Sequence, residues 1–437
     1  MEWYGVLAFF LIGLIFLLLS GFPIAFSFLL MDFLGVLFFM GPVGLKHLPL
    51  NIFTSISTFA LAPVPLFIFM GELMFHSQIA NNSIDVLDRW LGRIPGRLSL
   101  LAATSGTIFA ATSGSSMANT AMLGTVLLPE MKKRGYSTSM SVGPILGVGG
   151  LAMLIPPSAL AVVLASIGRF SVGRTLVAGV IPGIILGIMF TVYIVLSAWL
   201  RPSIAPTYNV ESCTLVQRLF LTAKYLLPVG FIIFMVIGVI ILGVATPTEA
   251  AASGVIGTIL VIVVYGRFNW QVVKATMTGT LQITVMVFMI ITASKTFSSV
   301  LAFTGASGGL TDLVRGLDVH PLVILICMQV IIAFMGTFME SVSIMMICLP
   351  VFMPISDVLG FDPVWFGILM LINLEMGQIT PPFGMLLFVM KSVTSDDITI
   401  QEICRAAVPY IVFDVLVMAM IIIWPSIALW LPDLIGA

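Results

Sequence analysis

Two stretches of the chain place a pair of prolines inside an apolar run that is otherwise long enough to form a membrane helix. The first is GGLAMLIPPSALAVVLA, with Pro156 and Pro157, and the second is NLEMGQITPPFGMLLFVM, with Pro381 and Pro382. A proline cannot donate a backbone hydrogen bond to the carbonyl four residues before it. Each pair therefore leaves two backbone carbonyls without their helical donor in the middle of an apolar segment.

The carbonyls that lose their donor belong to Ala152 and Met153 in the first stretch and to Gly377 and Gln378 in the second. Bare carbonyls are costly at membrane depth unless a partner binds them. A small cation such as Na⁺ suits them, because its coordination needs only oxygens. The breaks therefore indicate cation sites, although a purely structural kink explains either break alone equally well. The recurrence of break and polar hairpin in both halves favours the functional interpretation.

Each break is preceded along the chain by two short apolar arms joined by a polar tip. The first tip is TSGSS, at 112–116, and the second is MGTFMES, at 335–341. Both offer glycine, side-chain oxygens and free backbone N–H groups where the second arm restarts, and helix N-termini favour anions. We therefore expect an anion site at the tips, beside the cation sites. Its candidate contacts are Ser115, Ser116, Asn119, Thr337, Glu340 and Ser341.

The composition indicates an all-α protein that crosses a lipid bilayer many times. Of its 437 residues, 60% are hydrophobic and only 8% are charged, and the mean hydropathy is +1.19. A net charge of −1 gives no sign of a nucleic-acid partner. The four cysteines and three histidines lack the spacing of a metal site, so we expect no cofactor apart from Na⁺ as coupling ion. No span pairs Ser with His or Asp with Asp, which disfavours an intramembrane hydrolase, so we expect no enzyme activity.

Apolar runs predict ten membrane spans and two re-entrant hairpins. The spans lie near 4–20, 24–40, 52–76, 138–167, 175–200, 225–244, 250–266, 276–303, 364–390 and 408–431. The hairpin arms are Leu98–Thr112 and Met117–Met131 in the first half, and Pro321–Met335 and Ser341–Ile355 in the second. These arms fall short of the roughly 20 residues that a crossing needs, so we expect them to enter and leave on one side.

The two sets of segments match in order, which indicates an internal duplication. SGFPIAFSFLL near Pro23 resembles ATPTEAAASGV near Pro247, and LIPPS resembles ITPPF. Each half has five spans and one hairpin, and an odd number of crossings turns the second half upside down. The sequence therefore predicts an inverted repeat, which many secondary transporters use to build a site at the membrane midplane.

Two amphipathic stretches are too polar to span and suit helices that lie at the two interfaces. They separate helices that we expect to form a static scaffold from hairpins and broken helices that we expect to move, as in an elevator-type transporter. The predicted division is scaffold at 1–78, arm helix at 79–97, transport domain at 98–200 with hairpin 98–131 and broken helix 138–167, linker and scaffold at 201–303, arm helix at 304–320, and transport domain at 321–437 with hairpin 321–355 and broken helix 364–390.

The distribution of basic residues predicts the orientation in the membrane. With a periplasmic N-terminus, the cytoplasmic side holds Arg89, Arg93, Arg97, Lys132, Lys133, Arg134, Arg201, Arg218, Lys224, Arg267, Lys274, Lys391 and Arg405. Only Lys46, Arg169, Arg174 and Arg315 fall outside, and Lys295 stays near the membrane. The positive-inside rule therefore favours two periplasmic termini.

The tip SGSS, followed by GGLAMLIPPS and NLEMGQITPPFGM, resembles the DctM-type large membrane subunit of tripartite ATP-independent periplasmic (TRAP) transporters, over essentially the whole chain. The resemblance implies Na⁺-coupled uptake of organic anions across the bacterial inner membrane by an elevator mechanism. It also implies two partners, a small four-helix membrane subunit and a periplasmic substrate-binding protein. We expect the small subunit to be a separate polypeptide, because the chain starts directly at its first span.

The resemblance also implies two sodium sites. One involves Ser113 or Ser115 with backbone oxygens around Ala152, Ile155 and Ser158, and the other involves Gly336, Gly377, Thr380 and the carbonyl of Phe383. Where this chain has Ala152 the family often has glycine, which puts in doubt how closely the first hairpin approaches. A stand-alone Na⁺/organic-anion symporter of the same architecture, without a binding protein, remains an alternative.

Other ionisable and polar residues in or near apolar spans have open roles. Lys295 and Glu72 either serve function or lie at span ends with their charges reaching water. Asn373 and Glu375 precede the second break and either orient it or contact a ligand directly.

Overall fold

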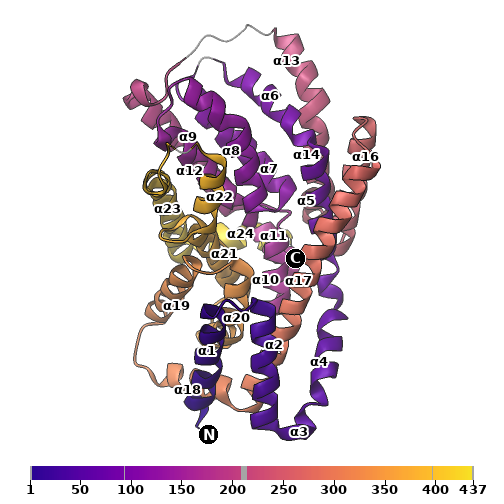
Figure 1. The fold of residues 1–437 in the computed structure, drawn as a ribbon, viewed down its shortest axis with the longest axis vertical. Coiled ribbons are helices and arrows are strands. Elements are labelled where there is room, and N and C mark those ends of the chain that lie inside the picture. The colour runs from indigo at the N-terminus through magenta and orange to yellow at the C-terminus, as the bar shows by residue number, and fades with distance from the viewer. Residues whose placement is uncertain (1, 93, 208–213, 396, 436–437) are drawn as a thin grey trace.

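The computed structural model describes residues 2–92, 94–207, 214–395 and 397–435, and the described residues form helices and no strand (Figure 1). The helices are α1 (Trp3–Leu19), α2 (Ile24–Gly35), α3 (Gly41–Gly44), α4 (His47–Ile56), α5 (Pro63–Ser77), α6 (Ile79–Leu91), α7 (Arg97–Ser113), α8 (Ser116–Lys133), α9 (Thr138–Gly150), α10 (Ala159–Gly168), α11 (Val172–Ala178), α12 (Val180–Leu200), α13 (Leu215–Leu221), α14 (Leu227–Ile233), α15 (Val239–Ile241), α16 (Pro247–Val264), α17 (Trp270–Phe303), α18 (Ala306–Gly316), α19 (Pro321–Gly336), α20 (Ser341–Val358), α21 (Pro363–Ile379), α22 (Met385–Val393), α23 (Ile400–Ile423) and α24 (Ser426–Ile435).

Within the described ranges, eight continuous helical stretches have the length and apolar composition to cross a membrane. They are Ile24–Gly44, Phe59–Ser77, Val172–Leu200, Leu215–Ile241, Pro247–Val264, Trp270–Phe303, Ser341–Val358 and Ile400–Ile423. The two predicted spans with proline pairs are each split into two shorter helices, as the sequence predicts. These stretches support a polytopic all-α membrane protein.

Two predicted boundaries are wrong. The run at 52–76 is not one helix, because α4 ends at Ile56 and α5 starts at Pro63, a residue suited to the first turn of a helix. The second arm of the second hairpin does not stop near Ile355. Pro350 and Pro354 are accommodated inside α20, which continues to Val358 and is long enough to cross. Its side chains are largely buried, so packing against neighbouring helices offsets the hydrogen bonds that the prolines remove.

The long helix α17 packs against α2, α4 and α5, and α16 covers α5 on another side. Aromatic rings fix part of this contact. The ring of Phe297 on α17 lies edge-on to the rings of Phe10 and Phe28, with centroids 5.1 and 5.7 Å apart. All three rings are completely buried, so α1 and α2 are anchored on α17.

A second group of helices surrounds the two proline breaks. Helix α9 packs against α7, α8 and α23, and α21 packs against α19, α20 and α23. Helices α9 and α23 approach closely because α9 presents glycine to its neighbour: a Cβ added at Gly143 would lie 2.8 Å from the carbonyl oxygen of Ala406. The breaks are thus held in a tightly packed core.

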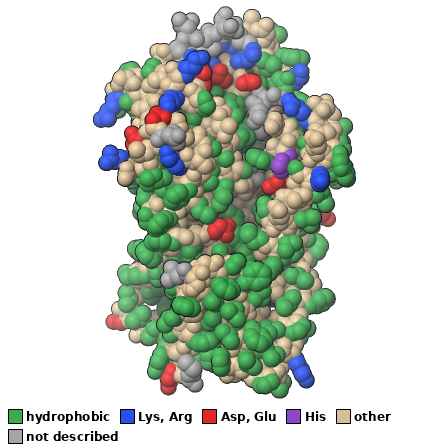
Figure 2. Space-filling view, in the orientation of Figure 1, with side chains coloured by type: hydrophobic (Ala, Val, Ile, Leu, Met, Phe, Trp, Pro, Cys, Tyr) green, Lys and Arg blue, Asp and Glu red, His purple; other side chains and the backbone are tan. Residues whose placement is uncertain are grey.

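Helices α6 and α18 correspond to the two predicted interfacial stretches, and they lie near opposite ends of the molecule (Figure 1). Figure 2 shows lysine and arginine side chains gathered at the end where α6 and α13 lie, with few at the opposite end. This asymmetry follows the charge distribution predicted from the sequence, although Arg93 lies outside the described residues.

A partly buried ion pair ties α6 to α7. Arg97, only 2% exposed, donates from Nη2 to the backbone carbonyl of Asp88 at 2.6 Å and contacts its carboxylate at 2.7 Å. Burial raises the pKa of Asp88, and the neighbouring Arg97 guanidinium opposes that shift. The start of the first hairpin is therefore fixed to the helix before it.

Replacing Arg97 by alanine is expected to lower the free energy of unfolding by about 1.5–3 kcal/mol, because hydrogen bonds to a charged group are lost and the partner is left half-buried. The measurement is chemical denaturation in detergent. Lys132→Ala, which breaks an exposed ion pair with Asp397, is the control and should cause no measurable change. Equal destabilisation by both variants would contradict the structural role of Arg97.

Candidate functional site

At the first break, α9 runs into a 3₁₀ turn at Leu151–Met153, the cis peptide bond between Pro156 and Pro157 follows, and α10 begins after Ser158. The Ser158 hydroxyl donates to the carbonyl of Met153 at 2.6 Å and accepts from the N–H of Ala161 at 3.2 Å. The hydroxyl therefore donates a hydrogen bond to one of the carbonyls that the prolines leave without a helical donor. Ala152 and Ser158 are completely buried, while Ile155 is partly buried.

The second break has the same construction. Helix α21 ends at Ile379, Pro381 and Pro382 are joined by a cis peptide bond, and α22 starts at Met385. Thr380 donates its N–H to the carbonyl of Gly377 at 3.2 Å and its hydroxyl to the carbonyl of Met376 at 2.6 Å. The Gly377 carbonyl thus accepts a bond from three residues ahead in place of the one that Pro381 cannot make.

Both hairpin tips touch the break of their own half. The first tip turns at Gly114, where a Cβ would lie 3.5 Å from the carbonyl oxygen of Pro157, and Ser115 caps α8 by accepting from the N–H of Ala118 at 3.3 Å. The second tip comes closer: a Cβ added at Gly336 would lie 2.8 Å from the Cα of Gly377. Backbone therefore meets backbone at the second tip, and glycine is required on both sides.

The two tip-and-break assemblies meet at Ser341. Its hydroxyl accepts a hydrogen bond from Nε2 of Gln378 at 3.1 Å and lies 3.9 Å from the sulfur of Met153. Met153 belongs to the first break and Gln378 to the second, so the start of α20 lies between them. A second link comes from Glu375, whose buried side chain packs against Gly150 at the end of α9.

The other residues that were predicted to contact the anion have different surroundings. Ser116 is buried at the start of α8, and Thr337 donates its hydroxyl to the carbonyl of Phe334 at 2.8 Å. Asn119 donates from Nδ2 to the carbonyls of Gly106 and Val148, at 3.1 and 3.2 Å, so its amide ties the first hairpin to α9.

Three further residues that were predicted to bind sodium or the anion lie at the tips or at the second break. Glu340 lies at the N-terminus of α20, where the hydroxyl of Ser343 is 3.5 Å from its Oε2. Phe383 is half exposed, with its ring 5.4 Å from that of Phe338 in the second tip. Ser113 ends α7, and its side chain lies outside the described residues.

The side chains of Gln378, Met153 and Phe338 are part of this arrangement, yet the sequence did not single them out. Gln378 carried a signal, because a polar residue beside a proline break in an apolar helix is unusual. Met153 and Phe338 carried none, because methionine and phenylalanine are common throughout the chain.

The residues with open roles have other partners. Asn373 donates from Nδ2 to the backbone carbonyl and to Oε1 of Gln329, at 2.7 and 2.8 Å, and so joins α21 to α19. Glu72 lies 3.2 Å from Nε2 of His76, and Lys295 donates to the carbonyl of Thr54 at 3.2 Å. None of these contacts reaches the hairpin tips.

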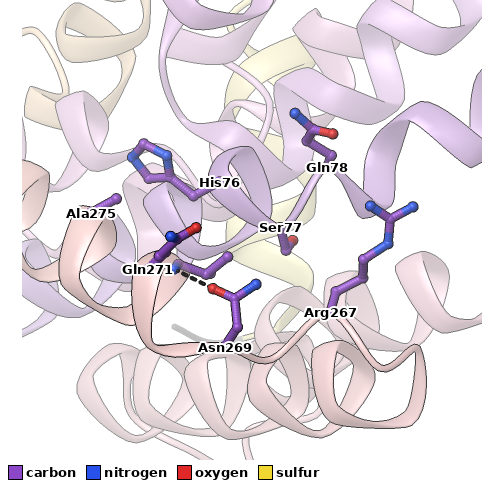
Figure 3. Close-up of a pocket in the computed structure, with 8 residues that line it drawn as sticks. His76, Ser77, Gln78, Arg267, Asn269, Gln271 and Ala275 are labelled. Carbon is purple, nitrogen blue, oxygen red and sulfur yellow. Dashed lines mark hydrogen bonds between the residues drawn. The ribbon is translucent and has the colours of Figure 1, made fainter.

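A separate polar pocket of about 350 Å³ lies between the end of α5 and the connection from α16 to α17 (Figure 3). Arg267, Asn269 and Gln78 line it, and the Oδ1 of Asn269 accepts from the N–H of Val272 at 2.9 Å to cap α17. None of the predicted site residues lines this pocket. The hairpin tips and breaks therefore remain the candidate site.

Comparison with known proteins identifies the family. Residues 11–427 match the family model described as the DctM component of the tripartite ATP-independent periplasmic transporter. The chain belongs to the DctM family. It is 32% identical to the C4-dicarboxylate TRAP transporter large permease protein DctM of Pseudomonas aeruginosa, over 90% of this chain and 91% of the relative. It is also 32% identical to the ectoine TRAP transporter large permease protein TeaC of Halomonas elongata, over 96% of this chain and 97% of the relative.

Two solved structures share the fold of this DctM-family chain. The YdaH transporter of Alcanivorax borkumensis has a TM-score of 0.64 at 15% identity, covering 90% of each chain. MtrF of Neisseria gonorrhoeae has a TM-score of 0.66 at 14% identity, covering 89% of this chain and 85% of the other. At this identity the likeness extends to the fold alone. The named relatives are permeases, which agrees with a transporter rather than an enzyme.

Proposed function

We propose that this chain is the large membrane subunit of a sodium-coupled secondary transporter that imports a small organic anion, a carboxylate or a sulfonate, across a bacterial inner membrane. The observation that carries the proposal is the meeting of two tip-and-break assemblies at Ser341. Broken helices supply carbonyl and hydroxyl oxygens for cations, and helix N-termini at the tips supply N–H groups for an anion.

The sodium ions are assigned to the two breaks. One site uses Ser113 or Ser115 with backbone oxygens of Ala152, Ile155 and Ser158, and the other uses Gly336, Gly377, Thr380 and the carbonyl of Phe383. The close contact of Gly336 with Gly377, and the Thr380 hydroxyl beside them, support the second assignment. The anion is assigned to the tips, near Ser341.

Two partners complete the proposed transporter, a separate small four-helix membrane subunit and a periplasmic substrate-binding protein. The family supports both, because its printed description is a component of a tripartite periplasmic transporter. The proposal also includes an inverted repeat, elevator movement of hairpins and broken helices against a scaffold, and periplasmic termini. The repeated tip-and-break construction supports the first two, and the basic side chains near α6 support the orientation.

The substrate class rests on relatives. Their printed names include C4-dicarboxylate, sialic acid from Vibrio cholerae and isethionate from Oleidesulfovibrio alaskensis, which are organic anions, and also ectoine. We therefore propose an acid with one or two anionic groups. A thermal-shift screen of the cognate binding protein against these four compounds identifies which one is carried.

Reconstitution in proteoliposomes tests the proposal. Vesicles that contain this chain and the small subunit are expected to take up the identified acid only when the loaded binding protein is added and an inward Na⁺ gradient is present. Replacing that gradient by K⁺ is the control and should abolish uptake. Uptake without the binding protein would contradict the tripartite proposal and support the stand-alone symporter.

A further inference from the structure

A cavity of about 830 Å³ lies apart from the hairpin tips, and none of the proposed sodium or anion ligands lines it. The cavity is lined by residues from the region of α4, from α17, from the end of α10 and from α20. Six serines line the cavity. One threonine and three charged side chains also line it, so the cavity offers several polar partners to water or to a polar ligand.

Two cationic side chains line this cavity, Lys295 on α17 and Arg169 directly after α10. Neither forms an ion pair in the part of the chain that the structure describes. Lys295 donates one hydrogen bond, to the carbonyl of Thr54, and an ammonium has three donors. Their positive charges also repel each other. An anion between them relieves that repulsion.

The other polar groups do not cancel this charge. Asp357 on α20 is the acidic residue among the lining side chains, so the lining keeps one net positive charge. The hydroxyls of Ser298 and Ser299 each donate to a backbone carbonyl of α17 at 2.9 Å. The two cations are therefore the groups that attract an anion.

The backbone at Arg169 gives an independent sign that its side chain matters. Arg169 has φ +61°, in the left-handed region, and its N–H closes α10 by donating to the carbonyl of Ala165. Glycine usually occupies this position, because a residue with a Cβ costs roughly 1–2 kcal/mol there. The chain keeps a long cationic side chain at a backbone position that disfavours it.

We propose that Arg169 and Lys295 form an anion vestibule, a first binding site that receives the carboxylate or sulfonate of the substrate before it reaches the hairpin tips. The inference rests on the proposed function for the identity of the anion. A polar cavity between apolar helices strengthens the field of the two cations and raises the local concentration of anions. Because Lys295 belongs to α17 and Arg169 follows α10, an anion bound by both cations links the two helices.

Charged thiol reagents test the vestibule without a transport assay. The four native cysteines are replaced by alanine, and Ser298→Cys places one thiol in the cavity. Its modification rate is measured with an anionic and with a cationic methanethiosulfonate reagent. We expect the anionic reagent to react faster. Arg169→Gln and Lys295→Gln should each lower the anionic-to-cationic rate ratio about 5- to 10-fold. The ratio changes strongly because loss of a positive charge slows the anionic reagent and also speeds the cationic one.

Two matched variants sharpen the result. Asp357→Asn should raise the ratio, because it removes the negative charge of the lining. Lys132→Gln should leave it unchanged, because Lys132 does not line the cavity and pairs with Asp397 at 2.7 Å. If Ser298→Cys fails to fold, Ser307→Cys serves as the second reporter on the same lining.

Occupancy is tested with succinate and isethionate as probe anions at constant ionic strength. Both should slow modification of the thiol by the anionic reagent, and Arg169→Gln or Lys295→Gln should remove that protection, while glycerol gives none. A rate ratio that ignores both substitutions, or protection that survives them, overturns the vestibule. Uptake by the unsubstituted complex is measured separately. A complex that transports normally without these effects therefore refutes the vestibule and leaves the proposed function standing.

Discussion

Replacing Gly336 by alanine is expected to remove most sodium-dependent uptake while the chain still folds. A Cβ at this position would lie 2.8 Å from the Cα of Gly377 and 3.8 Å from its nitrogen, so the methyl group collides with backbone that no rotamer change can move. The second hairpin tip must therefore withdraw from the break. We expect the sodium concentration at half-maximal uptake to rise at least about tenfold, which corresponds to about 1.4 kcal/mol.

The measurement is uptake in proteoliposomes over a range of Na⁺ concentrations, with size-exclusion chromatography and thermal unfolding to confirm the fold. Gly377→Ala should behave alike, because its Cβ would lie 2.7 Å from the Cα of Gly336. Gly308→Ala on α18 is the control, since no neighbouring atom lies within 4 Å of the added methyl group. If Gly336→Ala kept a normal sodium dependence, the contact of tip and break would not be part of the sodium site.

Local chemistry made the breaks and tips predictable. Proline removes a donor wherever it stands, and α9 and α21 end before Pro156 and Pro381, as the proline pairs predict. The arms were predicted for a similar reason, because glycine and hydroxyl residues separate two apolar runs. Helix α7 ends at Ser113 and α8 begins at Ser116, as the polar tip indicates.

The contacts between these elements could not be predicted, because they depend on how helices distant in sequence are turned toward each other. Nothing near Ser341 indicates that it lies between Gln378 and Met153, which are 37 and 188 residues away. The hydrogen-bond partners of the two hydroxyls could not be predicted from the sequence either. The sequence places Ser158 and Thr380 beside bare carbonyls, but only the structure shows that the Ser158 hydroxyl donates to one of them, that of Met153. The Thr380 hydroxyl donates instead to Met376, and its backbone N–H donates to Gly377.

The end of the second hairpin's second arm was also misjudged. The predicted arm, Ser341–Ile355, already contained Pro350 and Pro354, but α20 continues to Val358 and is long enough to cross a membrane. The surrounding helices decide this outcome, because most side chains of α20 are buried in the core. A proline pair at the centre of a span and a single proline inside a packed arm therefore have different consequences.

Thr380→Ala is expected to raise the sodium concentration at half-maximal uptake about tenfold, while Thr380→Ser stays close to the unsubstituted chain. The Thr380 hydroxyl donates its proton to the carbonyl of Met376, so its oxygen lone pairs remain free to face a cation. Serine keeps this oxygen, whereas alanine removes it. Thr380→Val is the matched control for shape, and it should fail as alanine does.

The same variants distinguish a Thr380 hydroxyl that binds sodium from one that only stabilises the fold. If the hydroxyl only satisfies Met376, then Thr380→Ala and Thr380→Val lower the thermal unfolding temperature and leave the sodium dependence unchanged. If it binds sodium, added Na⁺ stabilises the serine variant against unfolding but stabilises the alanine and valine variants much less, because a ligand stabilises only the state that binds it.

The first half has Ile155 at the matching position, which offers no hydroxyl, so its site must depend more on backbone oxygens. Losing Thr380 should therefore weaken the binding of one sodium ion and spare the other.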